Sequence, residues 1–149
     1  MSSCNVKLIL HRFITRNLLN FFMSTRINYG ILGAGHLGGF HAQQLKNISG
    51  VNVVGVFDIN INNAKRVAQQ YGVPVFQSPE KLLSLCNAVS ITTPATNHFD
   101  STLLALEHNC HVFIEKPFTR NVNEAQQLIE LKKNKKLKIQ IGHIERFNP

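Results

Sequence analysis

A glycine-rich turn between an apolar run and a helical pattern is the feature that most constrains this chain. Residues 27–38 read Ile-Asn-Tyr-Gly-Ile-Leu-Gly-Ala-Gly-His-Leu-Gly. Gly33 lets the chain turn tightly, and Gly35 has no side chain to keep a pyrophosphate from the backbone. Gly38 lets the next helix pack closely on the strand, and the N–H groups at that helix N-terminus attract phosphate. The pattern predicts a dinucleotide-binding turn.

An acidic residue follows this turn at the distance expected for a ribose ligand. Asp58 stands 20 positions after Gly38 and directly follows a second apolar run, 51–57. At the end of a strand, its carboxylate can accept hydrogen bonds from the ribose hydroxyls of a dinucleotide. The alternative is a glycine-rich loop with an unrelated Asp, and the strand–turn–helix context argues against it.

The same carboxylate bears on the choice between NAD and NADP. A negative charge at Asp58 disfavours the 2′-phosphate of NADP, and no Arg follows at Ile59 or Asn60. Lys65 and Arg66 lie a turn or more into the next predicted helix and weaken this argument only slightly. NAD is therefore the expected cofactor, and NADP is less favoured.

Strand patterns alternate with helical patterns along the chain. Strands are expected in the run before Gly33 and at 51–57, 73–76, 88–92, 111–114 and 137–141, and helices at 36–47, 61–71, 79–85, 97–108 and from Asn121 or Asn123 onward. Pro74 places its strand at or near a sheet edge. The alternation predicts an α/β fold: one doubly wound parallel sheet of the Rossmann type, with strand order 3-2-1-4-5-6. Ligands bind such sheets beyond the carboxyl ends of the strands.

The charge of the chain is uneven. The net charge is +8 over 149 residues, a length that suits a single domain, and five of the lysines crowd residues 132–138. These lysines fit either a nucleic-acid or anionic-membrane patch or the solvated end of a helix. Because no aromatic residues interleave with them, we favour the helix end, and we expect neither nucleic acid nor membrane as a partner.

The three cysteines, Cys4, Cys86 and Cys110, include no close pair. This spacing argues against a disulfide framework and against a metal site. We expect Cys86 and Cys110 to be small buried residues of a protein in a reducing compartment, and therefore cytoplasmic.

Residues 1–23 differ from the rest of the chain. Charged residues interrupt their apolar run, so they cannot span a bilayer, and they do not resemble a secretory signal. An organelle transit peptide, a start of translation at Met23, and a loosely held amphipathic helix are all compatible with them. We favour the last two, leave these residues outside the fold, and assign the dinucleotide-binding domain to 24–149.

Several motifs occur together in a fixed order. After the glycine turn and Asp58 come Thr92-Thr93-Pro94 with His98, then Glu115-Lys116-Pro117, then the tail Gly142-His143-Ile144-Glu145-Arg146-Phe147-Asn148-Pro149. Over residues 26–149 the chain resembles the N-terminal half of the Gfo/Idh/MocA oxidoreductases. These are NAD(P)-dependent enzymes that act mainly on sugars, inositols and related polyols. The Glu-Lys-Pro triplet is the most diagnostic of these motifs.

The resemblance implies roles for residues at the strand ends. Lys116 would donate to a substrate hydroxyl and stabilise charge as an alcohol becomes a carbonyl, and Glu115 would help to hold the lysine and the cofactor. An exposed loop lysine is the alternative for Lys116. His98 would either border the nicotinamide or be a partly exposed residue that opens a helix. The remaining cofactor-binding residues are expected to be Gly33, Gly35, His36, Leu37, Gly38, Asp58, Thr92, Thr93 and Pro94.

The family's second domain has no counterpart before Pro149. In the family, that domain supplies most of the substrate pocket and the downstream Asp and His that complete catalysis. We therefore expect a cofactor-binding half with little or no turnover alone, which would use a sugar or polyol in the complete enzyme. A non-catalytic NAD-binding regulatory module is the alternative. An apolar face left without the second domain would favour self-association.

Overall fold

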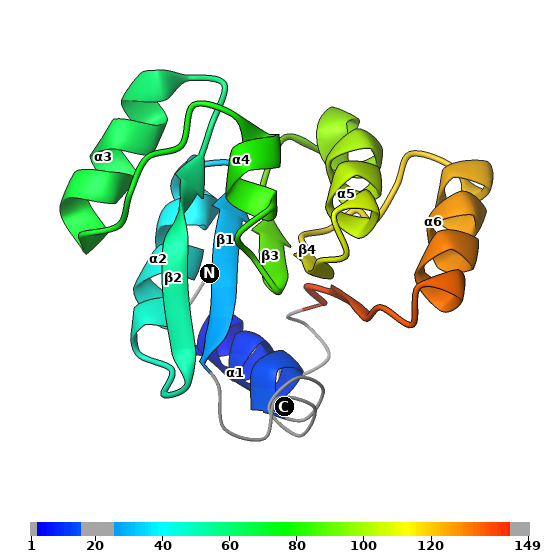
Figure 1. The fold of residues 1–149 in the computed structure, drawn as a ribbon, viewed down its shortest axis with the longest axis horizontal. Helices are drawn as coiled ribbons and strands as arrows, with labels where there is room; N and C mark the ends of the chain where they lie inside the picture. The colour runs from blue at the N-terminus through cyan, green and yellow to red at the C-terminus, as the bar shows by residue number, and fades with distance from the viewer. Residues whose placement is uncertain (1–2, 16–25, 144–149) are drawn as a thin grey trace.

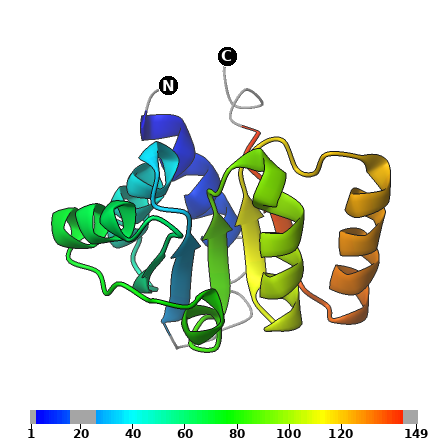
Figure 2. The ribbon, with the colours of Figure 1, turned by 90° about the horizontal axis from the view of Figure 1, so that it is seen from above.

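The structure is a computed structural model that describes residues 3–15 and 26–143. These residues form one β-sheet between two layers of helices (Figures 1 and 2). The strands are β1 (Ile27–Leu32), β2 (Val51–Phe57), β3 (Ala88–Ile91), β4 (His111–Ile114) and β5 (Ile139–Ile141). The helices are α1 (Ser3–Ile14), α2 (His36–Lys46), α3 (Ile61–Tyr71), α4 (Pro79–Leu83), α5 (His98–Glu107) and α6 (Val122–Asn134), with a short 3-10 turn, η2 (Ala95–Asn97). Among the described residues, no helix is long and apolar enough to cross a membrane.

The sheet has the predicted doubly wound topology. Its strands follow the order β2-β1-β3-β4-β5, and every adjacent pair is parallel. The predicted strand at 73–76 is reduced to one parallel bridge, between Val75 and Val56 of β2. Pro74 has no N–H to extend the pairing, so this segment stays a fragment at the sheet edge. With that segment counted as the third strand, the order agrees with 3-2-1-4-5-6.

Each face of the sheet packs against its own helices. The first core joins α1, α2 and α3 to one face, with Ala42, Leu45, Ala64 and Val67 packed near Tyr29, Ile31 and Val56. The second joins α4, α5 and α6 to the other face, with Leu82, Leu83, Leu106 and Leu128 packed near Val89, Ile91, Val112 and Ile114. Figure 2 shows the sheet between these two layers. Because all the strands are parallel, the loops after β1, β2, β3 and β4 leave at one common edge.

Among the described helices, three begin with a side-chain cap. The side chains of Asn60, Ser78 and Asn121 each accept a hydrogen bond from a backbone N–H in the first turn of α3, α4 and α6. Asn97, the residue predicted to begin the helix at 97–108, instead ends the turn η2, and its side chain makes no capping bond. The loop after β3 thus contains a 3-10 turn, and α5 begins directly after it, at His98.

Helix α1 packs on the sheet, so the expectation that residues 1–23 lie outside the fold is wrong for the described part of this segment. Ile9, Leu10, Phe13 and Ile14 are buried in the first core. The Phe13 ring meets Phe113 of β4 edge-on, with ring centres 6.0 Å apart. The amphipathic pattern thus belongs to a packed helix that covers part of the sheet. Residues 16–25, including Met23, lie outside the described part of the chain.

The lysine-rich stretch lies where α6 ends. Lys132 and Lys133 are in its last turn, where cations face the negative end of the helix dipole. Lys135 donates hydrogen bonds to the Glu107 carbonyl (3.1 Å) and to Asn109 Oδ1 (3.0 Å), at the end of α5. These positions fit the interpretation of the cluster as a helix end.

Cys86 and Cys110 lie in an apolar environment. Cys110 is buried and Cys86 is half-buried. Burial raises the pKa of each thiol to about 12, so both stay protonated at neutral pH. Neither thiol has the depressed pKa of a nucleophilic cysteine.

We predict that Phe13→Ala lowers the free energy of unfolding by about 3 kcal/mol, because it removes a buried ring and leaves a cavity against Phe113. The measurement is urea unfolding followed by circular dichroism. Leu8→Ala is the matched control on the same helix: Leu8 is 41% exposed, so its truncation should cost less than about 1 kcal/mol. Equal effects of the two substitutions would mean that α1 does not pack on the sheet.

Candidate functional site

The glycine turn after β1 packs against the end of β3. Gly33 has a φ of 97°, and a Cβ there would lie 2.6 Å from the carbonyl atoms of Thr92. A Cβ on Gly38 would overlap the Gly33 carbonyl oxygen. Gly35 differs, because a Cβ there would meet nothing within 4 Å. Gly33 and Gly38 are thus required by close packing, whereas Gly35 borders open space.

The N-terminus of α2 is available to bind an anion. Gly35 is its N-cap residue, and no side chain caps the helix. The N–H groups of the first turn have no acceptor within the helix and lie at the positive end of the helix dipole. Together with the open space at Gly35, this arrangement fits a diphosphate.

Asp58 and Arg66 both fix the backbone of the turn. Asp58 Oδ2 accepts a hydrogen bond from the N–H of Ala34 at 2.5 Å, and its Oδ1 accepts from the N–H of Asn60 at 2.7 Å. Arg66 Nη2 donates to the Ala34 carbonyl at 2.9 Å. Arg66 lies a turn or more into the predicted helix and is therefore expected to have only a slight effect near Asp58. The long side chain instead reaches back to the turn, which helical spacing alone does not indicate.

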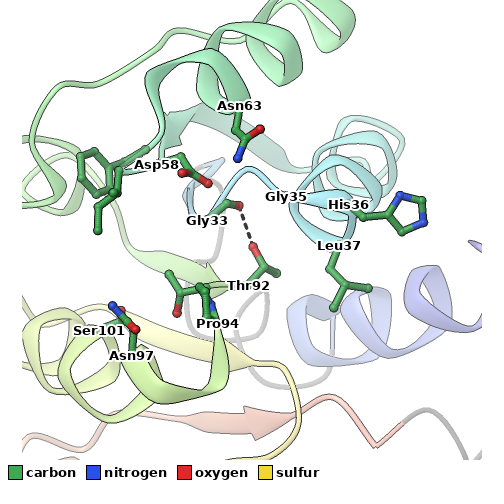
Figure 3. A pocket seen from close by; sticks show the side chains of 13 residues that line it. Gly33, Gly35, His36, Leu37, Asp58, Asn63, Thr92, Pro94, Asn97 and Ser101 are labelled. Atoms are coloured by element: carbon green, nitrogen blue, oxygen red, sulfur yellow. Dashed lines mark hydrogen bonds between the residues drawn. The ribbon is translucent and has the colours of Figure 1, made fainter.

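A cavity of about 400 Å³ opens beside this turn (Figure 3). Of the predicted cofactor-binding residues, those that line it are Gly33, Gly35, His36, Leu37, Asp58, Thr92, Thr93 and Pro94. Those that do not are Gly38, His98 and Glu115, and neither does Lys116. Sequence reasoning missed Phe57, Ile59, Asn63, Asn97 and Ser101. Asn63 and Ser101 are in the first turns of α3 and α5. Both helices begin at the sheet edge that carries the cavity, and this shared position is the feature that could have indicated the two residues from the sequence.

The two threonines after β3 have different surroundings. Thr92 Oγ1 donates to the Gly33 carbonyl at 2.7 Å, drawn as the dashed line in Figure 3, and is also 3.1 Å from the Leu32 carbonyl. Thr92 thus holds the glycine turn in place. Thr93 Oγ1 is buried and has no hydrogen-bond partner among the described residues. A hydroxyl or amide of a bound cofactor would satisfy it.

Glu115 and Lys116 follow β4 at the same edge. Ile91 of β3 pairs with Ile114 of β4, so Thr92-Thr93 and Glu115-Lys116 leave adjacent strands together. Lys116 is exposed, whereas Glu115 is 3% exposed. The Glu115 carboxylate pairs with His41 Nε2 at 3.0 Å. Among the described residues it makes no ion pair with Lys116, so any hold on the lysine acts through the backbone.

The two predicted histidines, His36 and His98, have different surroundings. His98 is buried, with Nε2 2.9 Å from the Thr93 carbonyl and Nδ1 2.5 Å from the Pro117 carbonyl, so it is not the partly exposed residue of the alternative interpretation. His36 packs edge-on against Phe40, and its ring points away from Asp58 in Figure 3. His143 is exposed, and Arg146 lies outside the described residues.

Comparison with known proteins agrees with this geometry. A family model described as "Oxidoreductase family, NAD-binding Rossmann fold" matches residues 27–143. UDP-N-acetylglucosamine 3-dehydrogenase of Acidithiobacillus ferrooxidans is 42% identical over 120 residues, which are 80% of this chain and 38% of that protein. The scyllo-inositol 2-dehydrogenase (NAD(+)) of Bacillus subtilis is 31% identical over 131 residues, again 38% of its length.

Solved structures agree with the sequence matches. A structure of the Acidithiobacillus ferrooxidans enzyme superposes with a TM-score of 0.80 at 40% identity, and the match covers 85% of this chain and 41% of that one. The chain therefore spans less than half of the length of these relatives. The match of the family model over most of the chain shows that this protein belongs to the Gfo/Idh/MocA oxidoreductases, through their NAD-binding Rossmann domain.

Proposed function

We propose that this chain is the cofactor-binding half of a dehydrogenase that oxidises a hydroxyl group of a sugar or polyol with NAD. The observation that carries the proposal is the open space at Gly35, where the uncapped N-terminus of α2 borders the cavity that Asp58 lines. The named relatives are dehydrogenases of a nucleotide-linked sugar and of an inositol, which supports the substrate class.

The proposed cofactor site uses three groups of this chain. The first-turn N–H groups of α2 bind the diphosphate. Each Asp58 oxygen accepts one backbone hydrogen bond and keeps a second lone pair, which can accept from a ribose hydroxyl. Thr93 Oγ1 donates to a polar group of the ligand in the cavity. Bound NAD would supply the hydride acceptor.

The preference for NAD over NADP rests on the balance of charge near Asp58. Its carboxylate would repel a 2′-phosphate. Arg66 is the cation that contacts the turn, but its guanidinium is bonded to the Ala34 carbonyl. A 2′-phosphate would have to compete with that bond for the guanidinium, so the arrangement favours NAD.

Lys116 is the proposed catalytic residue. Its ammonium group is exposed at the sheet edge that carries the cofactor cavity. From there it can donate to the substrate oxygen and stabilise negative charge as the C–H bond breaks. Hydride transfer also needs the substrate held against the cofactor from the opposite side. We propose that this wall corresponds to the part of the relatives that the present chain does not match, and that the chain alone binds NAD with little or no turnover.

A regulatory NAD-binding module is the second candidate. It is favoured by the lining of the cavity, which includes neither Glu115 nor Lys116. An activity assay separates the two candidates. Reduction of NAD by a panel of polyols and sugars is monitored by absorbance, with the chain assayed together with any longer product of its gene.

We predict that Gly35→Ala weakens NAD binding at least 10-fold without loss of stability. The new methyl group meets no protein atom but enters the space of the diphosphate. Isothermal calorimetry measures the affinity, and thermal unfolding measures the stability.

Gly39→Ala is the matched control, because a Cβ there would make only ordinary contacts, the nearest at 3.8 Å. It should leave NAD binding unchanged. Unaltered affinity in Gly35→Ala would overturn the assignment of the diphosphate to this turn.

We predict that Asp58→Asn reduces the ratio of the NADP and NAD dissociation constants by about 10-fold, which corresponds to about 1.4 kcal/mol. The substitution removes the charge that repels a 2′-phosphate and keeps an oxygen for one backbone hydrogen bond. Calorimetric titration with each dinucleotide gives the ratio. Glu130→Gln removes a carboxylate from the exposed surface of α6 and should leave the ratio unchanged. An unchanged ratio in Asp58→Asn would remove Asp58 from cofactor selection.

A further inference from the structure

Lys116 is exposed, but the residues on both sides of it are bonded to buried histidines. His41 on α2 has no exposed surface, and His98 on α5 is 2% exposed. His41 contacts the Glu115 side chain, and His98 contacts the Pro117 carbonyl. The exposed lysine is therefore flanked by two fixed neighbours.

His41 connects the helix of the glycine turn with the strand that precedes the lysine. Its Nε2 is 3.0 Å from Glu115 Oε1, and its Nδ1 is 2.8 Å from Ser90 Oγ. Ser90 Oγ is in turn 3.3 Å from the Tyr29 hydroxyl, which stays protonated because burial raises its pKa. A neutral ring that donates from Nε2 to Glu115 leaves Nδ1 as the acceptor, and the Ser90 hydroxyl can donate to it.

The surroundings of this pair leave it little freedom. The Phe113 ring lies edge-on to His41, with ring centres 5.3 Å apart. A Cβ on Gly142 would be 3.0 Å from Glu115 Oε2, so the carboxylate closely approaches the backbone after β5. Packing on these sides favours one orientation of both groups.

His98 ties the loop after β3 to the loop after β4. Nε2 is 2.9 Å from the Thr93 carbonyl and Nδ1 is 2.5 Å from the Pro117 carbonyl. Both partners are acceptors, so a neutral ring donates to one of them and a protonated ring to both. Thr93 lines the cofactor cavity, which makes His98 a direct link between that cavity and the residue after Lys116.

We propose that His41 and His98 are positioning residues that together fix the backbone of Lys116 relative to the cofactor cavity. The proposal rests on the proposed function, because that function gives Lys116 its role. A lysine side chain has four rotatable bonds, so its ammonium group reaches a substrate oxygen reproducibly only from a fixed Cα atom. His41 connects that atom to the helix that binds the diphosphate, and His98 connects it to the loop beside Thr93.

The test measures backbone order at Lys116 by ¹⁵N relaxation in the full 149-residue chain. In the wild-type protein, the order parameter of the Lys116 amide should match the rigid core, about 0.85. In His98→Ala and His41→Leu it should fall below about 0.6, while amides of α3 and α6 keep their values. His98→Gln and His41→Gln keep a side-chain donor and should restore much of the order.

His108→Gln is the matched control on α5. His108 also bonds a backbone carbonyl, that of Leu104 at 2.9 Å, but it lies at the opposite end of the helix from His98. The control should leave the Lys116 amide unchanged even if it lowers the melting temperature. An unchanged order parameter in both His98→Ala and His41→Leu would overturn the proposal.

A measurement on the wild-type protein keeps the proposal testable if a variant does not fold. In a long-range ¹H–¹⁵N spectrum, His41 should carry a proton on Nε2, the nitrogen 3.0 Å from Glu115 Oε1. A ring protonated on Nδ1 alone could not donate to Glu115 and would contradict the proposal.

Failure of this inference is distinguishable from failure of the proposed function. NAD titration of the wild-type chain tests the cofactor site, and the order parameters test the two histidines. Absence of NAD binding with an ordered Lys116 would count against the function alone, whereas NAD binding with a disordered Lys116 would count against the two histidines alone.

Discussion

The close contact between the glycine turn and the end of β3 is the constraint on which the site depends. Thr92 donates to the Gly33 carbonyl, and no side chain fits at Gly33 or Gly38. This contact sets where α2 begins and keeps its N-terminus at the sheet edge. Asp58 reinforces it from β2 by binding the Ala34 N–H. Residues at the ends of β1, β2 and β3 thus hold the glycine turn in place, and the cavity lies beside this turn.

The order of the elements and much of the cavity lining followed from local patterns. Glycines at required spacings, an acid at a strand end and capping residues act over a few neighbouring positions, so a single sequence carries their signal. The same holds for the strand order, since the handedness of parallel crossovers leaves few arrangements. Asn97 is an exception, because the loop after β3 tightens into a 3-10 turn that its composition does not indicate.

The side-chain contacts that cross between elements could not be predicted in this way. Arg66 reaches back to the turn from α3, and Glu115 pairs with His41, which lies 74 positions earlier. These bonds depend on how the helices lie on the sheet, and no short-range sequence pattern indicates that arrangement. The resemblance to the family indicated that Glu115 matters but did not indicate that its carboxylate faces inward.

The presence of helix α1 makes the packing of the sheet depend on where translation starts. A translation product that starts at Met23 would lack the side chains that cover Phe113, and Phe113 in turn lies against His41. Water would then reach the apolar ring beside the His41–Glu115 pair, and screening would weaken that pair. Two products of one gene would thus differ in more than length: in the shorter one, the pair beside Lys116 would be more hydrated and less rigidly held.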